Sequence, residues 1–298
     1  MSRLLLVGLL GWAATFALST PGNPVVDLTL RRHQLTGMLV SHLSVAAVIA
    51  AIAPRRHAIL AWVPVWAPHT WLVFAAAIST AILGSWLAVV HVAPGYAAAL
   101  SRESGPVEPL QAGFYFIAAW LAWQCAWRGK TPGERRLYRV ASGACIALML
   151  EEIEYFGLIE TFVGGRIEGV WVRSLHDLIG LGMRVRGVHI ALVAAAVVAA
   201  AIVVAWIGPR AIVAEITSAR SLVTGAAGGA LALSQVLDQN GRALTRVLGP
   251  MTTRLEEPLE LIASVLLTTA VVMKLASLAQ RSAMTPSTAG VVSARPAR

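Results

Sequence analysis

The stretch best equipped for chemistry places carboxylates directly after an apolar run. Glu151, Glu152 and Glu154 follow the apolar residues from Val140 to Leu150. An acidic residue at the centre of a bilayer costs about 2.5–3.5 kcal/mol, so such residues usually face the interior of a helix bundle and pair there. On a helix, Glu151 and Glu154 share one face, whereas Glu152 points about 100° away. In the alternative interpretation, the run ends at the outer headgroup level and the carboxylates are simply solvated.

Two further candidate segments lie later in the chain. His176 and Asp177 are adjacent between two apolar segments, where such a pair serves either as ligands or as a loop or helix-cap feature. Glu256, Glu257 and Glu260 open the last apolar segment. Acidic residues stabilise a helix N-terminus through its dipole, and Glu257 with Glu260 makes another i, i+3 carboxylate pair. Each segment has a structural explanation by itself, so their coincidence is the stronger observation.

Carboxylates from two helices together with a histidine are ligands that Zn, Fe or Mn accepts. We predict a divalent metal site with the ligands Glu151, Glu154, His176, Glu257 and Glu260. Glu151, His176 and Glu257 would be catalytic in a membrane hydrolase or related lipid-active enzyme, in which the metal activates water toward an ester or amide. The same carboxylates would also suit a proton- or cation-coupled transporter. In a third hypothesis the chain is a non-catalytic subunit of a membrane complex, and its acidic residues are structural.

The composition requires a membrane environment. Of the 298 residues, 57% are hydrophobic and 13% charged, whereas soluble domains carry about 25% charged residues. The mean hydropathy of +0.70 agrees. We predict an all-α, polytopic transmembrane bundle over residues 1–279 and a disordered tail over 280–298. The net charge of +9 is explained by basic cytoplasmic loops that meet anionic lipids. We expect membrane lipids and other membrane proteins as partners, and no nucleic acid, because no run mixes basic residues with stacking aromatics.

Eight apolar segments are long enough to be candidate spans. They are 4–20, 35–53, 70–93, 112–127, 139–160, 186–207, 222–238 and 259–279. The first is either a cleaved secretory signal or, as we favour, an uncleaved helix. The seventh is short and rich in glycine, so it is either a close-packed helix or a re-entrant segment. The bundle therefore has eight spans, or seven if this segment turns back.

The charges orient the bundle. The densest basic stretch runs from Arg128 to Arg139 and should be cytoplasmic. With eight spans and both termini inside, the three acidic segments then fall together on the outer side. If the seventh segment does not span, Glu256, Glu257 and Glu260 move to the opposite face and the site breaks up.

Taken together, the three segments resemble a group of uncharacterised bacterial multipass membrane proteins with EEISWGQ-like, NLHN-like and EE-containing motifs. The matching residues are Glu151-Glu152-Ile153, then Leu175-His176-Asp177, then Glu256-Glu257 with Glu260. The chain departs from the pattern where Glu154-Tyr155-Phe156-Gly157 replaces Ser-Trp-Gly-Gln and where Asp177 replaces Asn. The resemblance implies one joint site and a bacterial cytoplasmic (inner) membrane location, and it names no reaction.

Overall fold

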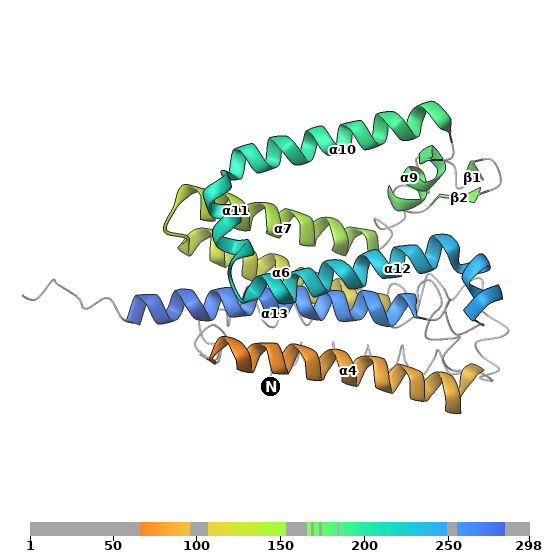
Figure 1. Ribbon diagram of the computed structural model, residues 1–298, viewed down its shortest axis with the longest axis horizontal. Coiled ribbons are helices and arrows are strands. Elements are labelled where there is room, and N and C mark those ends of the chain that lie inside the picture. Colours follow the sequence, from red (N-terminus) through yellow and green to blue (C-terminus); the bar gives the residue numbers. More distant parts are fainter. Residues whose placement is uncertain are drawn as a thin grey trace, which may run out of the picture.

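The computed structural model describes residues 66–95, 107–152, 166–167, 170–172, 175–183, 185–248 and 255–283. This part of the chain is almost entirely helical (Figure 1). Its helices are α4 (Pro68–Val92), α6 (Val107–Arg128), α7 (Pro132–Glu152), α9 (Leu175–Met183), α10 (Arg186–Ile207), α11 (Pro209–Ile216), α12 (Arg220–Leu248) and α13 (Glu256–Ala283). One short antiparallel hairpin joins β1 (Arg166–Ile167) to β2 (Val170–Trp171). The all-α prediction is confirmed.

The predicted segments can be compared with these helices. Four of them, 70–93, 112–127, 186–207 and 259–279, correspond to α4, α6, α10 and α13. The segment 139–160 coincides with α7 as far as Glu152, and 222–238 lies inside α12. The segments 4–20 and 35–53 and the tail from 284 to 298 lie outside the described residues.

Three of the described helices are long and apolar enough to cross a membrane. They comprise Pro68–Val92, Val188–Ile207 and Glu256–Arg281. The prediction of a membrane protein is thereby supported in its general form, while the number of eight spans stays a prediction.

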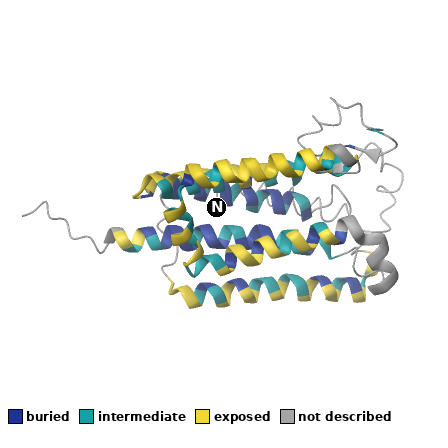
Figure 2. Ribbon diagram, turned by 45° about the horizontal axis from the view of Figure 1, so that its top comes forward, coloured by how far each residue is buried: buried dark blue, intermediate teal, exposed yellow. Residues whose placement is uncertain are grey.

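Helix α13 is the centre of the bundle and contacts α4, α6 and α12. On one side, Trp71 of α4 and Ala227 of α12 pack with Ile262, Leu266 and Met273 of α13. Another cluster joins α6 and α7 to α13 through side chains that include Leu121, Cys125, Tyr138 and Leu275. Because α13 is covered on several sides, most of its side chains are buried, as Figure 2 shows.

Helix α10 has the opposite character. It contacts α7 and α9, yet most of its apolar side chains face outward, including Val197, Val198 and Ile202 (Figure 2). A soluble protein rarely exposes so large an apolar surface, whereas lipid-facing helices require one. The exposure of α10 therefore agrees with a membrane environment.

The helix directions decide where the acidic segments meet. Near the start of α6, Gln111 bonds to Glu257 at the start of α13, and Cys125 near the end of α6 contacts the carbonyl of Val271. Helices α6 and α13 are therefore parallel. Helix α12 is one continuous helix of 29 residues that follows α13 in the opposite direction. It begins beside the later half of α13 and reaches Glu260 through Ser234. The seventh segment does not turn back, so α13 begins at the end of the bundle where α7 ends.

Candidate functional site

Acidic residues from three helices gather at this end of the bundle. Glu108 lies in the first turn of α6, Glu151 and Glu152 end α7, and Glu257 and Glu260 lie in the first turns of α13. We call these five residues the carboxylate cluster. The charges that act on Glu152 are, from the strongest, those of Glu260, Glu257, Glu108 and Glu151. Because like charges raise one another's energy, the cluster favours uptake of a proton or another cation.

Two buried polar side chains of α6 adjoin the cluster. Gln111 is fully buried and donates from Nε2 to the carbonyl oxygen of Glu257 at 3.0 Å and to its Oε2 at 3.3 Å. Tyr115 is also fully buried and interacts electrostatically with Glu152 and Glu260. Within the described structure, Gln111 Oε1 and the Tyr115 hydroxyl have no hydrogen-bond partner. An unsatisfied buried polar group costs about 1–3 kcal/mol, so this pair is suited to contact something small and polar at the cluster.

Helix α12 adds a fourth side to the site. The buried Ser234 hydroxyl lies 3.2 Å from Oε1 of Glu260 and 2.8 Å from the carbonyl oxygen of Leu231. Serine in a helix can bond in this way to a carbonyl oxygen of its own preceding turn. The contact ties Glu260 to α12 and limits the directions in which its carboxylate can turn.

The structure brings together three of the predicted metal ligands, Glu151, Glu257 and Glu260, at one end of the bundle. Glu154 lies outside the described residues. His176 lies in α9, which comes directly before the start of α10 on this side of the bundle (Figure 1), but the His176 side chain is outside the described part. Among the side chains described, no group of three or more His, Cys, Asp or Glu residues is arranged to hold a metal ion. The predicted metal site therefore stays a prediction.

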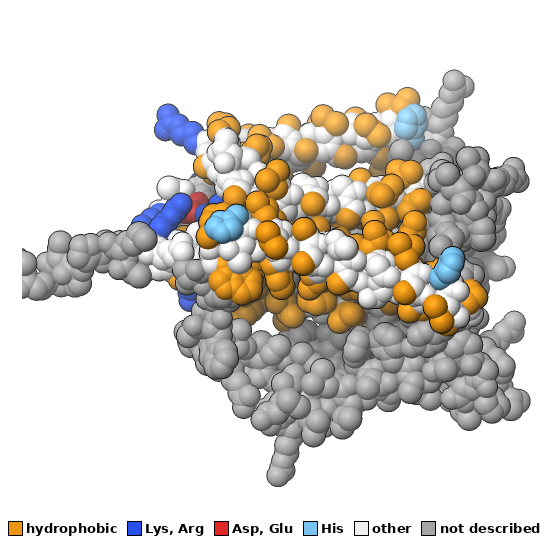
Figure 3. Space-filling model, turned by 60° about the horizontal axis from the view of Figure 1, so that its bottom comes forward, with side chains coloured by type: hydrophobic (Ala, Val, Ile, Leu, Met, Phe, Trp, Pro, Cys, Tyr) orange, Lys and Arg blue, Asp and Glu red, His pale blue; other side chains and the backbone are white. Residues whose placement is uncertain are grey.

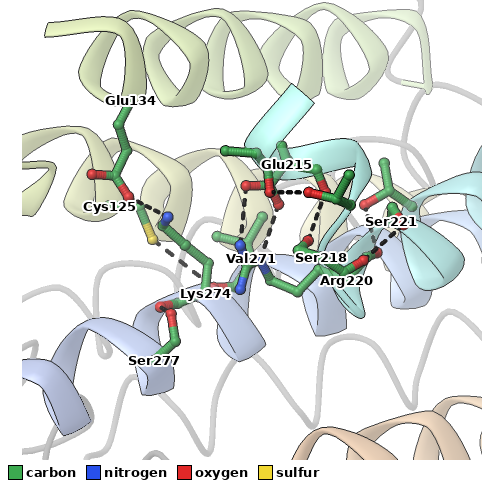
Figure 4. Close-up of polar contacts among 12 residues, drawn as sticks. Cys125, Glu134, Glu215, Ser218, Arg220, Ser221, Val271, Lys274 and Ser277 are labelled. Carbon is green, nitrogen blue, oxygen red and sulfur yellow. Dashed lines mark hydrogen bonds and ion pairs between the residues drawn. The ribbon is translucent and has the colours of Figure 1, made fainter. Parts of the chain in front are cut away.

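A buried ion pair marks the opposite end of the bundle. Nζ of Lys274, whose side chain is 5% exposed, pairs with Oε1 of Glu134 at the start of α7 (Figure 4). Nζ also lies 5.1 Å from the centre of the Tyr138 ring. The backbone N–H of Lys130 donates to Glu134 Oε2 at 2.9 Å. Burial alone would raise the pKa of Glu134. The hydrogen bonds from Lys274 and Lys130 outweigh this effect, so the pKa lies below its ordinary value.

A second ion pair at the same end connects α11 to α12. Arg220 donates from Nε to Oε1 of Glu215 at 2.9 Å and from Nη2 to Oε2 at 3.1 Å, the two-pronged geometry that gives strong carboxylate binding (Figure 4). Burial would lower the pKa of Arg220, but the hydrogen bonds to Glu215 raise it above its ordinary value. Arg136 of α7 donates to the carbonyl oxygen of Trp206 at 2.8 Å and so holds the end of α10.

Sequence reasoning missed Gln111, Tyr115 and Lys274. Lys274 had a signal, because a lysine within the apolar segment 259–279 needs a partner. A glutamine and a tyrosine at the start of an apolar helix are ordinary, so nothing in the chain distinguished Gln111 or Tyr115.

The charges of the described residues are separated along the bundle. Lysine and arginine side chains gather at one end of the face in Figure 3, where α7 begins and α13 ends. Among the described side chains, the basic residues of this end are Arg128, Lys130, Arg135, Arg136, Arg139, Arg210, Arg220, Lys274 and Arg281. We call it the basic end.

No protein-family model matches this chain, and comparisons with curated proteins and with solved structures find no match either.

Proposed function

We propose that the chain is a multipass protein of a bacterial cytoplasmic membrane, with eight spans and its basic end in the cytoplasm. The three membrane-length helices, and the packing of α6, α7 and α12 along α13, support a bundle of this kind. The basic residues support the orientation, because cytoplasmic loops carry an excess of lysine and arginine. The carboxylate cluster then lies at the outer side.

We infer that the cluster binds a proton or another cation in coupled transport. The observation that carries this inference is the convergence of four carboxylates on Glu152, beside the buried polar atoms of Gln111 and Tyr115. Each carboxylate added to such a group increases the benefit of neutralising one of them.

The position of the buried ion pair between Lys274 and Glu134 favours a transporter over a hydrolase whose reaction takes place at one membrane face. Lys274 pairs with Glu134 on the same helices, α13 and α7, that contribute most of the cluster. Buried Ser142, Ser264 and Thr269 lie on these helices between the two ends. A hydrolase needs polar groups at one face, whereas a transport route needs them at successive depths.

The test is charge movement in reconstituted vesicles, recorded by solid-supported-membrane electrophysiology after a jump in pH or in Na⁺ concentration. Binding of a cation inside the membrane field displaces charge even when the transported substrate is unknown. The wild-type protein should show such a displacement, and Glu152→Gln or Glu260→Gln should lose most of it. Glu256→Gln is the matched control, because Glu256 lies in the same turn of α13 but is not among the charges that act most on Glu152. Equal displacement in all four proteins would reject the proposal.

A second candidate is the metal-dependent hydrolase. The observation that favours it is the meeting of Glu151, Glu257 and Glu260 at the end where α9, with His176, is also found. Its test is the metal content of the detergent-purified protein, measured by mass spectrometry. Near-stoichiometric Zn, Fe or Mn that disappears in the Glu151→Ala, Glu257→Ala double variant would support the hydrolase over the transporter. Folded protein with neither metal nor charge movement would leave a structural subunit of a membrane complex.

A further inference from the structure

A cavity at the basic end is separate from the carboxylate cluster. It has a volume of about 620 Å³ and lies between the start of α7, the corner of α10 and α11, the start of α12 and the end of α13. Small-molecule sites have volumes of about 300–1,000 Å³. The cavity is therefore large enough for a ligand.

The local sequence explains why the cavity exists. Gly208 has φ 93°, which glycine adopts without strain, and Pro209 then begins α11 in a new direction. Helix α11 consequently lies across the ends of the long helices instead of continuing α10 (Figure 1). Gly133 lets α7 approach this corner, since a Cβ atom there would lie 2.9 Å from both the Ala211 Cβ and the Ile207 carbonyl oxygen.

The charges of the lining favour an anion. Four basic residues and two acidic residues line the cavity: Arg210, Arg220, Lys274, Arg281, Glu134 and Glu215. Glu134 pairs with Lys274, and Glu215 pairs with Arg220. The four basic residues outnumber the two acidic residues, so the lining is positive as a whole.

The apolar part of the surroundings favours an anion that belongs to a lipid. Leu137, Ile207 and Pro209 also line the cavity. On α11, Val213 and Ile216 are 57% and 64% exposed, while Glu215 of the same helix lines the cavity. A short helix with one apolar and one charged face, lying across the ends of long apolar helices, is typical of the membrane interface. Basic pockets between helices on the cytoplasmic side are suited to anionic headgroups.

We propose that this cavity binds the phosphate-bearing headgroup of an anionic phospholipid. The phosphate lies against Arg210 and Arg281, and the apolar lining contacts the glycerol and upper acyl chains. The lipid connects α11 to the end of α13. The inference does not depend on whether the carboxylate cluster transports a cation or serves a hydrolase.

The experiment measures lipid retention by native mass spectrometry and the unfolding temperature of the full chain in detergent. Phosphatidylglycerol, phosphatidylcholine and inorganic phosphate are added separately. The wild-type protein should retain phosphatidylglycerol in preference to phosphatidylcholine, and phosphatidylglycerol should raise its unfolding temperature. Inorganic phosphate should neither compete nor stabilise. Equal stabilisation by inorganic phosphate would instead assign the cavity to a free anion and overturn the lipid proposal.

Three variants separate the cavity from general surface charge. Arg210→Gln with Arg281→Gln should lose most of the preference for phosphatidylglycerol, because the basic residues of the lining then no longer outnumber its acidic residues. Ala214→Phe fills the cavity without changing its charge and should lower lipid retention as well. Arg139→Gln is the control, an exposed arginine of α7 outside the lining. Retention unchanged in the double variant, or lost equally in Arg139→Gln, would overturn the proposal.

Discussion

The two ends of the bundle differ in how their charged side chains are arranged. At the basic end, Lys274 pairs with Glu134 and Arg220 with Glu215, so charges of opposite sign neutralise one another. At the carboxylate end, like charges converge on Glu152. A buried charge needs its partner, because removing that partner leaves the charge uncompensated, whereas converging like charges cost stability and are typical of sites that bind something. The ion pairs of the basic end therefore connect neighbouring helices, whereas the cation site that we propose lies at the carboxylate end.

The largest effect should come from breaking the buried ion pair. Glu134→Ala leaves Lys274 buried without its partner, and removing one partner of such a pair costs about 3–5 kcal/mol. The measurement is the free energy of unfolding in mixed detergent micelles. Replacing both residues, as Glu134→Leu with Lys274→Leu, should recover most of this loss. A double variant as unstable as Glu134→Ala would show that the pair is not the cause.

Close packing should also matter at the basic end. Gly133→Ala places a methyl group 2.9 Å from Ala211 Cβ and Ile207 O, so the corner between α10 and α11 must shift, at a cost of about 1–3 kcal/mol. Gly143→Ala is the matched control in the same helix, because its Cβ meets nothing within 4 Å. It should stabilise α7 by about 0.5–1 kcal/mol. The same sign in both variants would contradict the packing argument.

At the carboxylate end, the sign of the effect should reverse. Glu152→Gln removes one carboxylate of the cluster and should raise the free energy of unfolding, at a pH high enough to ionise the cluster, by about 1 kcal/mol, on the order of one screened charge pair. The same variant should lose cation-dependent charge movement. A destabilisation comparable with that of Glu134→Ala would remove the contrast between the two ends.

A smaller change should sharpen the role of Tyr115. Its hydroxyl is buried and has no hydrogen-bond partner in the described structure, so Tyr115→Phe should raise the free energy of unfolding by about 1 kcal/mol or less. Charge movement in vesicles should fall if the hydroxyl contacts the bound cation. Unchanged charge movement would limit the site to its carboxylates.

The smallest effect is the acid sensitivity of the basic end. The pKa of Glu134 is lowered in the folded state, so its contribution to stability is complete above the ordinary carboxylate pKa. This contribution is lost as the pH falls toward the folded pKa and Glu134 becomes protonated. The measurement is the unfolding temperature from about pH 6 down to about pH 2, which extends below the ordinary carboxylate pKa of about 4.3. Glu134→Gln should make the unfolding temperature less dependent on pH in the acidic range. A curve identical to that of the wild-type protein would show that Glu134 is not responsible for the acid sensitivity.

Much of the fold was predictable because hydropathy is a local property. The segments 70–93, 112–127, 186–207 and 259–279 each became a helix, since twenty apolar residues in lipid must satisfy their own backbone. The grouping of Glu151 with Glu257 and Glu260 was also predicted, on the condition that the seventh segment runs the length of the bundle. The glycine-rich sequence of the seventh segment did not show whether it runs along the bundle or turns back. The structure shows that this segment lies inside the continuous helix α12.

By itself, the sequence determined that the chain belongs in a membrane and where its described helices lie. Only the tertiary structure decided which charges meet. Gln111 and Glu257 are 146 residues apart in the chain, and Glu134 and Lys274 are 140 apart. The parallel course of α6 and α13 brings the first pair together, and the packing of α7 on this unit brings the second. The length of an apolar helix can be read from its own residues, but which helices lie beside it depends on the packing of the whole bundle.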